Sequence, residues 1–219
     1  MSRFLRLFSL PFGLLAASIA HAAAPPNMLV VLVDDLRWDD LGCAGHPFVK
    51  TPPMDRIARE GARFLHAFAV TPLCSPSRAT LLTGLYPHTH GITDNTERSE
   101  QSHKLATFPQ ALQQAGYETG YVGKWHMGND DSPRPGFDHW VCLKGQGSTH
   151  DPEVNVNGRS GRETGYVTDI LHNHAAAYLQ QGRDKPFLLY FAHKALHPET
   201  MQRADGSLSD PNASNFIPA

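Results

Sequence analysis

A chain of 219 residues, with 41% hydrophobic and 18% charged side chains, is long enough to bury a core and suits one domain or one large part of a domain. Its formal net charge of −2, without any Lys/Arg-rich tract, argues against a nucleic-acid-binding protein.

The first 22 residues are predicted to be a secretory signal peptide. Two arginines precede an apolar segment over residues 7–19, and the tripeptide at 20–22 has the small-x-small form of a cleavage site. An uncleaved membrane anchor is the alternative, although the apolar run is short for a span and is interrupted by a proline and a glycine. We expect a mature chain that begins near Ala23, is periplasmic or secreted, and has no stable membrane insertion.

The first predicted strand, Met28 to Val33, ends at two adjacent carboxylates. A continuous aliphatic run is typical of a strand buried on both faces. Asp34 and Asp35 follow it, and neighbouring carboxylates repel each other unless a cation offsets their charge. Ca²⁺ and Mg²⁺ prefer oxygen ligands, so the pair indicates either a divalent-metal site or an ordinary helix cap or turn.

A cysteine beside a helix start is the next feature. Residues 51–53 introduce a helix over 54–60, and residues 63–70 are predicted to form a strand that leads to Cys74. Ser75 is the expected N-cap, with Pro76 at the first helical position. Free amide hydrogens there, with Arg78 one turn further on, predict a site for sulfate or phosphate. The alternative is a small buried Cys74 and a solvent-facing Arg78.

Helices and strands continue to alternate along the rest of the chain. A helix over 108–115 precedes a strand over 117–122, and a helix over 169–181 precedes a strand over 186–192. This alternation predicts an α/β sheet with helices on both faces. Ligands of such sheets bind beyond the carboxyl ends of the strands. The candidates at such ends are Asp34, Asp35, Lys124, His126, His193 and His197.

Lys124 and His126 are two residues apart, so they would point the same way from an extended backbone and could reach one oxyanion. A solvated lysine and a structural histidine are the alternative. His193 and His197 follow the last strand, where a partly protonated histidine could act as an acid toward a departing oxygen. Surface loop histidines are the alternative for that pair.

Three motifs together resemble those of the sulfatase family, in the alkaline phosphatase superfamily. They are Cys74-Ser75-Pro76-Ser77-Arg78 with its Leu-Thr-Gly tail, Gly123-Lys124-Trp125-His126-Met127-Gly128, and Val33-Asp34-Asp35-Leu36-Arg37. The resemblance implies a mixed, mostly parallel, alkaline phosphatase-like sheet and hydrolysis of sulfuric esters. It also implies that a formylglycine-generating enzyme oxidises Cys74 to formylglycine, an aldehyde whose hydrate is the nucleophile.

The resemblance also implies a role for each matching residue. The implied catalytic residues are Cys74, Arg78, Lys124, His126 and His197, and the implied ligands of Ca²⁺, or alternatively Mg²⁺, are Asp34, Asp35 and the modified Cys74. Lys124 would contact the sulfate and the modified residue, and His126 would hold one hydroxyl of the hydrate. His197 is preferred over His193 for the sulfate because it precedes a proline, as in related sulfatases.

The resemblance extends from about residue 27 to the end of the chain, whereas family members are considerably longer. Their second half carries an Asp-Asn pair and another lysine, so residues 23–219 are expected to be the N-terminal portion of a sulfatase catalytic domain, its C-terminal part absent and its metal weakly held. A phosphonate or phosphate ester hydrolase and an inactive fragment remain alternatives. The sequence leaves open which small-molecule or saccharide sulfate ester is the substrate, and whether Cys43 and Cys142 form a disulfide.

Overall fold

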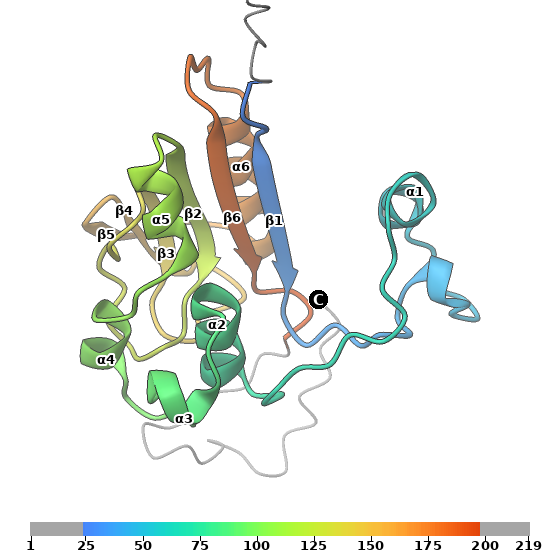
Figure 1. The fold of residues 1–219 in the computed structure, drawn as a ribbon, viewed down its shortest axis with the longest axis horizontal. Coiled ribbons are helices and arrows are strands. Elements are labelled where there is room, and N and C mark those ends of the chain that lie inside the picture. The colour runs from blue at the N-terminus through green and yellow to red at the C-terminus, as the bar shows by residue number, and fades with distance from the viewer. Residues whose placement is uncertain (1–23, 198–219) are drawn as a thin grey trace, which may run out of the picture.

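The computed structural model describes residues 24–197, so the predicted signal peptide and the last 22 residues lie outside the described part. A six-stranded sheet runs through it in the order β1-β6-β2-β3-β4-β5 (Figure 1). The strands are β1 (Met28–Val33), β2 (Glu118–Lys124), β3 (His139–Leu143), β4 (Glu153–Val156), β5 (Arg159–Arg162) and β6 (Phe187–His193). The first four strands in spatial order are parallel, and β4 and β5 continue the sheet antiparallel.

Helices cover both faces of this sheet. Residues 24–197 form the 3₁₀-helix η1 (Gly42–Ala44) and the α-helices α1 (Pro52–Glu60), α2 (Cys74–Thr83), α3 (Pro87–His90), α4 (Ser99–His103), α5 (Phe108–Gln114) and α6 (Val167–Leu179). Of these, η1 and α1 pack on each other and stand away from the sheet (Figure 1). Helix α6 packs on β2 and β6 from one side, while α5 and α2 lie on the other (Figure 1). The predicted α/β fold, with a mixed, mostly parallel sheet between two helical layers, is confirmed.

Successive residues of each strand supply two separate cores, because side chains alternate between the faces of a sheet. Tyr121 points toward α2 and stacks on Trp140, with 4.6 Å between ring centroids. The next residue, Val122, points toward α6 and packs with Leu171 and Tyr178. The two central strands, β2 and β3, are therefore buried on both sides, and the carboxyl end of β2 lies inside this packing.

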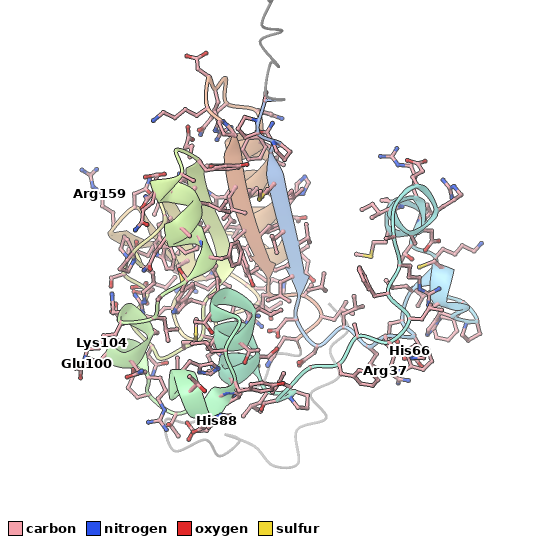
Figure 2. All side chains as sticks on the ribbon, in the orientation of Figure 1. Arg37, His66, His88, Glu100, Lys104 and Arg159 are labelled. Carbon is pink, nitrogen blue, oxygen red and sulfur yellow. The ribbon has the colours of Figure 1, made fainter. Side chains whose placement is uncertain are left out.

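Two strand predictions are wrong. Residues 63–70 form no strand, and Phe64 and Phe68 leave 83% and 86% of their surface exposed, because no described strand lies beside them to complete a hydrogen-bonded ladder. Strand β1 is not buried on both faces. Among the described residues it pairs with β6 alone, and Leu29 and Val31 are half exposed. Arg37 and His66 lie on the segments that stand away from the sheet beside this edge (Figure 2).

The antiparallel extension of the sheet has no counterpart among the sequence predictions. Strands β4 and β5 have only four residues each and are joined by Asn157 and Gly158, which both have positive φ, at 51° and 87°. An Asn-Gly pair is the preferred composition of such a two-residue turn. This dipeptide was the sequence signal that could have indicated the hairpin.

The three cysteines of the chain all lie in the described part and all are free, so Cys43 and Cys142 do not form a disulfide. Cys142 is completely buried among aromatic rings, and burial raises the pKa of its thiol to about 12. Within residues 24–197, none of the helices combines the length and the apolar character that crossing a bilayer requires.

Candidate active site

A cavity of about 490 Å³ lies where the carboxyl end of β1 meets the start of α2. Its polar lining residues are Asp34, Asp35, Cys74, Ser77, Arg78, Asn95, Gln146 and His197. Lys124 and His126 are buried beside it at the end of β2, with 0% and 7% of their surface exposed. The fold thus gathers every sequence-predicted site residue at one edge of the sheet, as expected for the carboxyl ends of parallel strands.

Asp34 is paired with two buried cations. Its Oδ2 accepts a hydrogen bond from Lys124 Nζ at 2.6 Å, and its Oδ1 lies 3.4 Å from Arg78 Nη2. Burial acts to raise the pKa of Asp34, but the attraction of Lys124 and Arg78 outweighs it and the pKa is lowered. The lowered pKa favours the carboxylate form of Asp34, which offsets part of the positive charge of Lys124 and Arg78 beside the cavity.

Arg78 is not solvent-facing, because 4% of its surface is exposed. Its Nη1 donates to the carbonyl oxygen of Lys124, which also accepts a hydrogen bond from the hydroxyl of Tyr121 at 2.6 Å. Arg78 was predicted to stand at a site for sulfate or phosphate, and its guanidinium lines the cavity while it also contacts protein oxygens. Arg78 thus orients Lys124 and Asp34.

Cys74 is the first residue of α2 and lies at the centre of the cluster. Its Sγ is 3.7 Å from Lys124 Nζ. One ligand atom each of Asp34, Cys74 and His197 lie within 4.8 Å of one another. An oxygen in place of this sulfur would lie between a carboxylate, an ammonium and an imidazole.

The prediction of free backbone amides at the start of α2 is wrong. The N-cap is Leu73 rather than Ser75, and the Ser75 hydroxyl instead donates to the carbonyl oxygen of His126. The Ser75 N–H donates to Asn95 Oδ1 at 2.9 Å, and the Ser77 N–H donates to the Leu73 carbonyl at 3.0 Å. Pro76 carries no N–H. This helix start therefore offers fewer donors to a ligand than the sequence predicted.

An extended backbone was expected from Lys124 to His126. His126 instead leaves the extended conformation of β2. It has a left-handed conformation with φ of 52°, which is unusual for a residue other than glycine. No described residue contacts its buried Nδ1 by a hydrogen bond. Burial, with the nearby charges of Lys124 and Arg78, lowers the pKa of His126 to about 3, so its imidazole is neutral at neutral pH.

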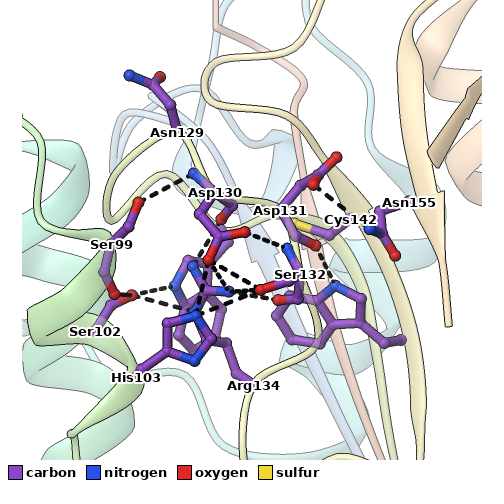
Figure 3. Close-up of polar contacts among 12 residues, drawn as sticks. Ser99, Ser102, His103, Asn129, Asp130, Asp131, Ser132, Arg134, Cys142 and Asn155 are labelled. Carbon is purple, nitrogen blue, oxygen red and sulfur yellow. Dashed lines mark hydrogen bonds and ion pairs between the residues drawn. The ribbon is translucent and has the colours of Figure 1, made fainter. Parts of the chain in front are cut away.

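The loop after His126 is anchored to α4, as Figure 3 shows. Ser102 Oγ accepts hydrogen bonds from Arg134 Nε at 3.2 Å and from Trp125 Nε1 at 3.3 Å. His103 Nε2 lies 2.8 Å from Asp130 Oδ2 in the same network. The Trp125 side chain, between Lys124 and His126, is thereby fixed in the core, which limits how far its two neighbours can move.

The end of β1 also positions the segment after β6. The Asp34 N–H donates to the Ala195 carbonyl at 2.8 Å, and the Leu196 N–H donates to the Asp34 carbonyl at 2.6 Å. These bonds bring His197 into the cavity, with its Nε2 3.9 Å from Asp35 Oδ2. His193 Nδ1 instead accepts the Ala195 N–H at 2.8 Å. The structure therefore brings His197, and not His193, to the cavity lining.

The chemical types of the possible metal ligands at the cavity suit a hard divalent cation. Asp34 and Asp35 contribute carboxylates, and Cys74 would contribute oxygen once oxidised, whereas its thiol is a soft ligand. Ca²⁺ takes six to eight oxygens. The two carboxylates and one oxidised side chain supply fewer oxygen ligands than that number. Asp34 is in addition already in contact with the cations of Lys124 and Arg78.

Sequence reasoning missed Asn95, Ser77 and Gln146 as cavity residues. Ser77 stood inside the cysteine motif, so its position was a usable signal. Asn95 is 20 residues from the backbone amide that it binds, and no local pattern connects the two.

Comparison with known proteins gives one family. The family model described as Sulfatase matches residues 26–213. N-acetylglucosamine-6-O-sulfatase of Bacteroides thetaiotaomicron is 40% identical over 199 residues, which cover 86% of this chain and 35% of that protein. Human N-acetylgalactosamine-6-sulfatase is 32% identical over 212 residues, covering 80% of this chain and 40% of the relative.

Solved structures agree with this result. The structure of a protein in complex with its substrate, D-glucosamine-2-N,6-O-disulfate, has a TM-score of 0.73 and 41% identity, covering 81% of this chain and 36% of that one. A sulfatase of Pseudoalteromonas sp. has a TM-score of 0.66 and 26% identity, covering 80% of this chain and 45% of that one. The chain spans less than half the length of these proteins. With most of its length matched by one family model, the chain belongs to the sulfatase family.

Proposed function

We propose that this protein is a sulfuric ester hydrolase whose nucleophile is a formylglycine made from Cys74. The observation that carries the proposal is the position of Cys74 in the cavity, with its sulfur 3.7 Å from the buried Lys124 ammonium. Asp34 and His197 complete the surroundings of that sulfur. Sulfatase relatives support the same reaction class.

The proposed cycle begins with the hydrate of the aldehyde. One hydroxyl oxygen attacks the sulfur of the ester, the bond from sulfur to the alcohol oxygen breaks, and the alcohol leaves with a proton. The second hydroxyl then loses its proton, the C=O bond reforms, and sulfate is expelled. One water restores the hydrate, so each turnover converts an ester and a water into an alcohol and sulfate.

The buried cations and histidines have separate roles in this cycle. Lys124 donates to a sulfate oxygen and to the modified residue, which stabilises the charge of the transition state. His126 is neutral near pH 7, because its pKa is about 3, and can therefore accept a hydrogen bond from the hydrate. His197, which lines the cavity, gives a proton to the departing oxygen.

A divalent cation, Ca²⁺ or alternatively Mg²⁺, would be held by Asp34, Asp35 and the oxidised Cys74, and would supply positive charge that favours the sulfate ester.

The proposed substrate class is the saccharide sulfate esters, in particular an amino sugar with sulfate on its primary 6-hydroxyl. The names of two relatives specify a 6-sulfate of an N-acetylated amino sugar, and a similar solved structure contains a 6-O-sulfated glucosamine. A cavity of about 490 Å³ at the site is large enough for one sugar with its sulfate.

Two measurements on protein purified from its native host test this function. Tryptic peptide 64–78 should be about 18 Da lighter than the unmodified sequence, the difference between a thiol and an aldehyde side chain. The purified protein should release sulfate from glucosamine-6-sulfate faster than phosphate from glucosamine-6-phosphate, and Cys74→Ala should abolish the release. An unmodified Cys74 throughout the sample, or faster phosphate release, would contradict the proposal.

We propose that the protein is exported and acts in the periplasm or outside the cell. The basic and apolar pattern of residues 1–22 supports cleavage near Ala23. N-terminal sequencing of the secreted or periplasmic protein should begin close to that residue, and an uncleaved Met1 would contradict the proposal.

A further inference from the structure

Asn95 brings a neutral amide to the cavity, and the proposed cycle gives it no role. It lies between α3 and α4 and lines the same cavity as Cys74, Arg78 and His197. A hydrogen bond to the backbone of Ser75 holds Asn95 against the first turn of α2, although Asn95 is not part of that helix.

The orientation of the Asn95 amide is fixed by its one hydrogen-bond partner. The Ser75 backbone N–H lies 2.9 Å from Asn95 Oδ1. A backbone N–H only donates, so the atom that faces it must be the oxygen, and the NH₂ group is on the other branch of the side chain. No described residue accepts a hydrogen bond from that NH₂. At the cavity, the Oδ1 of Asn95 is therefore already bound, while its NH₂ group can still donate a hydrogen bond.

The loop that carries Asn95 is held on both sides. Asp94 accepts hydrogen bonds from the Thr96 N–H at 3.0 Å and from Arg98 Nη2 at 2.9 Å. Just before the loop, at the end of α3, His90 Nε2 lies 3.1 Å from Thr80 Oγ1 and ties this segment to α2. Asn95 is thus placed by the folded chain before a ligand arrives, which lowers the entropy cost of any bond that its amide makes to a ligand.

Several hydrogen-bond donors at this cavity are already bound to protein groups. Arg78 donates to the Lys124 carbonyl and lies against Asp34, and the Ser75 N–H is bound to Asn95 itself. The oxygens of a sulfate ester can only accept hydrogen bonds. An NH₂ group at the wall supplies such a donor without adding a charge.

We propose that Asn95 is a substrate-binding residue whose Nδ2 donates to an oxygen of the bound sulfate ester, while its Oδ1 holds the start of α2. This inference rests on the proposed function, because it concerns the same ligand. It adds a role at a position outside the three motifs on which that function was based.

A single isosteric substitution separates the two roles of this side chain. In Asn95→Asp, one carboxylate oxygen still accepts the Ser75 N–H, and aspartate serves as well as asparagine at a helix start. The other oxygen replaces the donor by an acceptor and adds negative charge beside an anionic ligand. We expect unchanged thermal stability, and a fall of about 100-fold in kcat/KM for sulfate release, the usual loss for one donor to a reacting oxyanion.

Asn157→Asp is the matched control. Asn157 Oδ1 also accepts a backbone N–H, that of Trp140 at 2.8 Å, but in the β4–β5 turn and outside the cavity. We expect this variant to keep both its stability and its rate of sulfate release. Rates are compared per mole of formylglycine, measured on peptide 64–78 by mass spectrometry, so that incomplete oxidation of Cys74 is not mistaken for lost binding.

The outcomes separate this inference from the function on which it depends. A wild-type protein that releases no sulfate would overturn the proposed function itself. An active wild type with an equally active Asn95→Asp variant would overturn the role of Asn95 alone. A variant that melts well below the Asn157→Asp control would also overturn it, since the amide would then be needed for the helix and not for the ligand.

Discussion

At the scale of single residues, the site depends on one carboxylate that keeps two cations buried. Lys124 is completely buried, and an ammonium in that position requires a counter-charge. Asp34 provides it at 2.6 Å. Burial lowers the pKa of Lys124, while Asp34 acts to raise it. Each charge therefore offsets part of the desolvation of the other.

Replacing Lys124 by methionine tests this interdependence. Lys124→Met keeps a long apolar stem but leaves Asp34 with Arg78 as its remaining close cation. We expect a loss of about 3 kcal/mol in the free energy of unfolding, measured by urea denaturation, because a buried partner is removed. Sulfate release should become undetectable, since the same ammonium faces Cys74.

Lys104→Met is the control for that substitution. Lys104, which directly follows α4, also pairs with a carboxylate, that of Glu100 at 2.5 Å, but both side chains are exposed. We expect no measurable change in stability or in activity. Equal effects of the two substitutions would show that burial does not matter to the Lys124 pair.

At the scale of secondary-structure elements, the close contact of β2 with β6 places Lys124. Gly123 has a φ of 132°, and a Cβ there would lie 1.8 Å from the Ala192 carbonyl oxygen. No side chain fits between the two strands at this point. The strand end that carries Lys124 can approach β6 only because its preceding residue is glycine.

Gly123→Ala should therefore separate the strands and displace Lys124. We expect a loss of several kcal/mol of stability, from backbone strain and from overlap with a neighbouring backbone, together with lost sulfate release. Thermal denaturation and kinetics measure both. Gly161→Ala in β5, where a Cβ would meet nothing within 4 Å, should leave both unchanged. A stable and active Gly123→Ala variant would contradict this account of the β2–β6 contact.

At the scale of the whole molecule, four histidines of the described part, residues 24–197, resist protonation in the folded chain. Burial is the main cause that lowers the pKa of His90, His126, His139 and His193 below 6.5. In the unfolded chain the same groups bind protons near pH 6.5. Acid therefore favours the unfolded state at four separate places in the fold.

The sign of the resulting pH dependence follows from proton linkage. Because the unfolded state binds more protons, the free energy of unfolding is highest above pH 6.5 and falls as the pH drops toward the folded-state values. The melting temperature should decrease steadily between pH 7 and pH 5. His139→Asn should make this slope shallower, because it removes one of the four buried groups. A melting temperature that is constant over this range would refute the prediction.

The sequence by itself predicted the residues that the structure brings to the cavity and most of the elements that carry them. Met28–Val33 is the strand that its aliphatic run predicted, and helix α5 begins at Phe108, where the helix over 108–115 was predicted to start. These features depend on residues that are close in sequence. The α/β alternation then implied that the carboxyl ends of the strands meet, which brought Asp34, Lys124 and His197 to one place.

Only the tertiary structure decided what each polar group contacts. Ser75 looked like a helix cap and instead binds the carbonyl of His126, 51 residues away. Arg78 looked like an anion ligand and binds the carbonyl of Lys124, and Asn95 had no local signal at all. Local pattern fixes the conformation of a segment, because its hydrogen bonds close within a few residues. The partner of a buried side chain is chosen by whichever distant backbone group packing leaves unsatisfied, and that group is known only once the chain has folded.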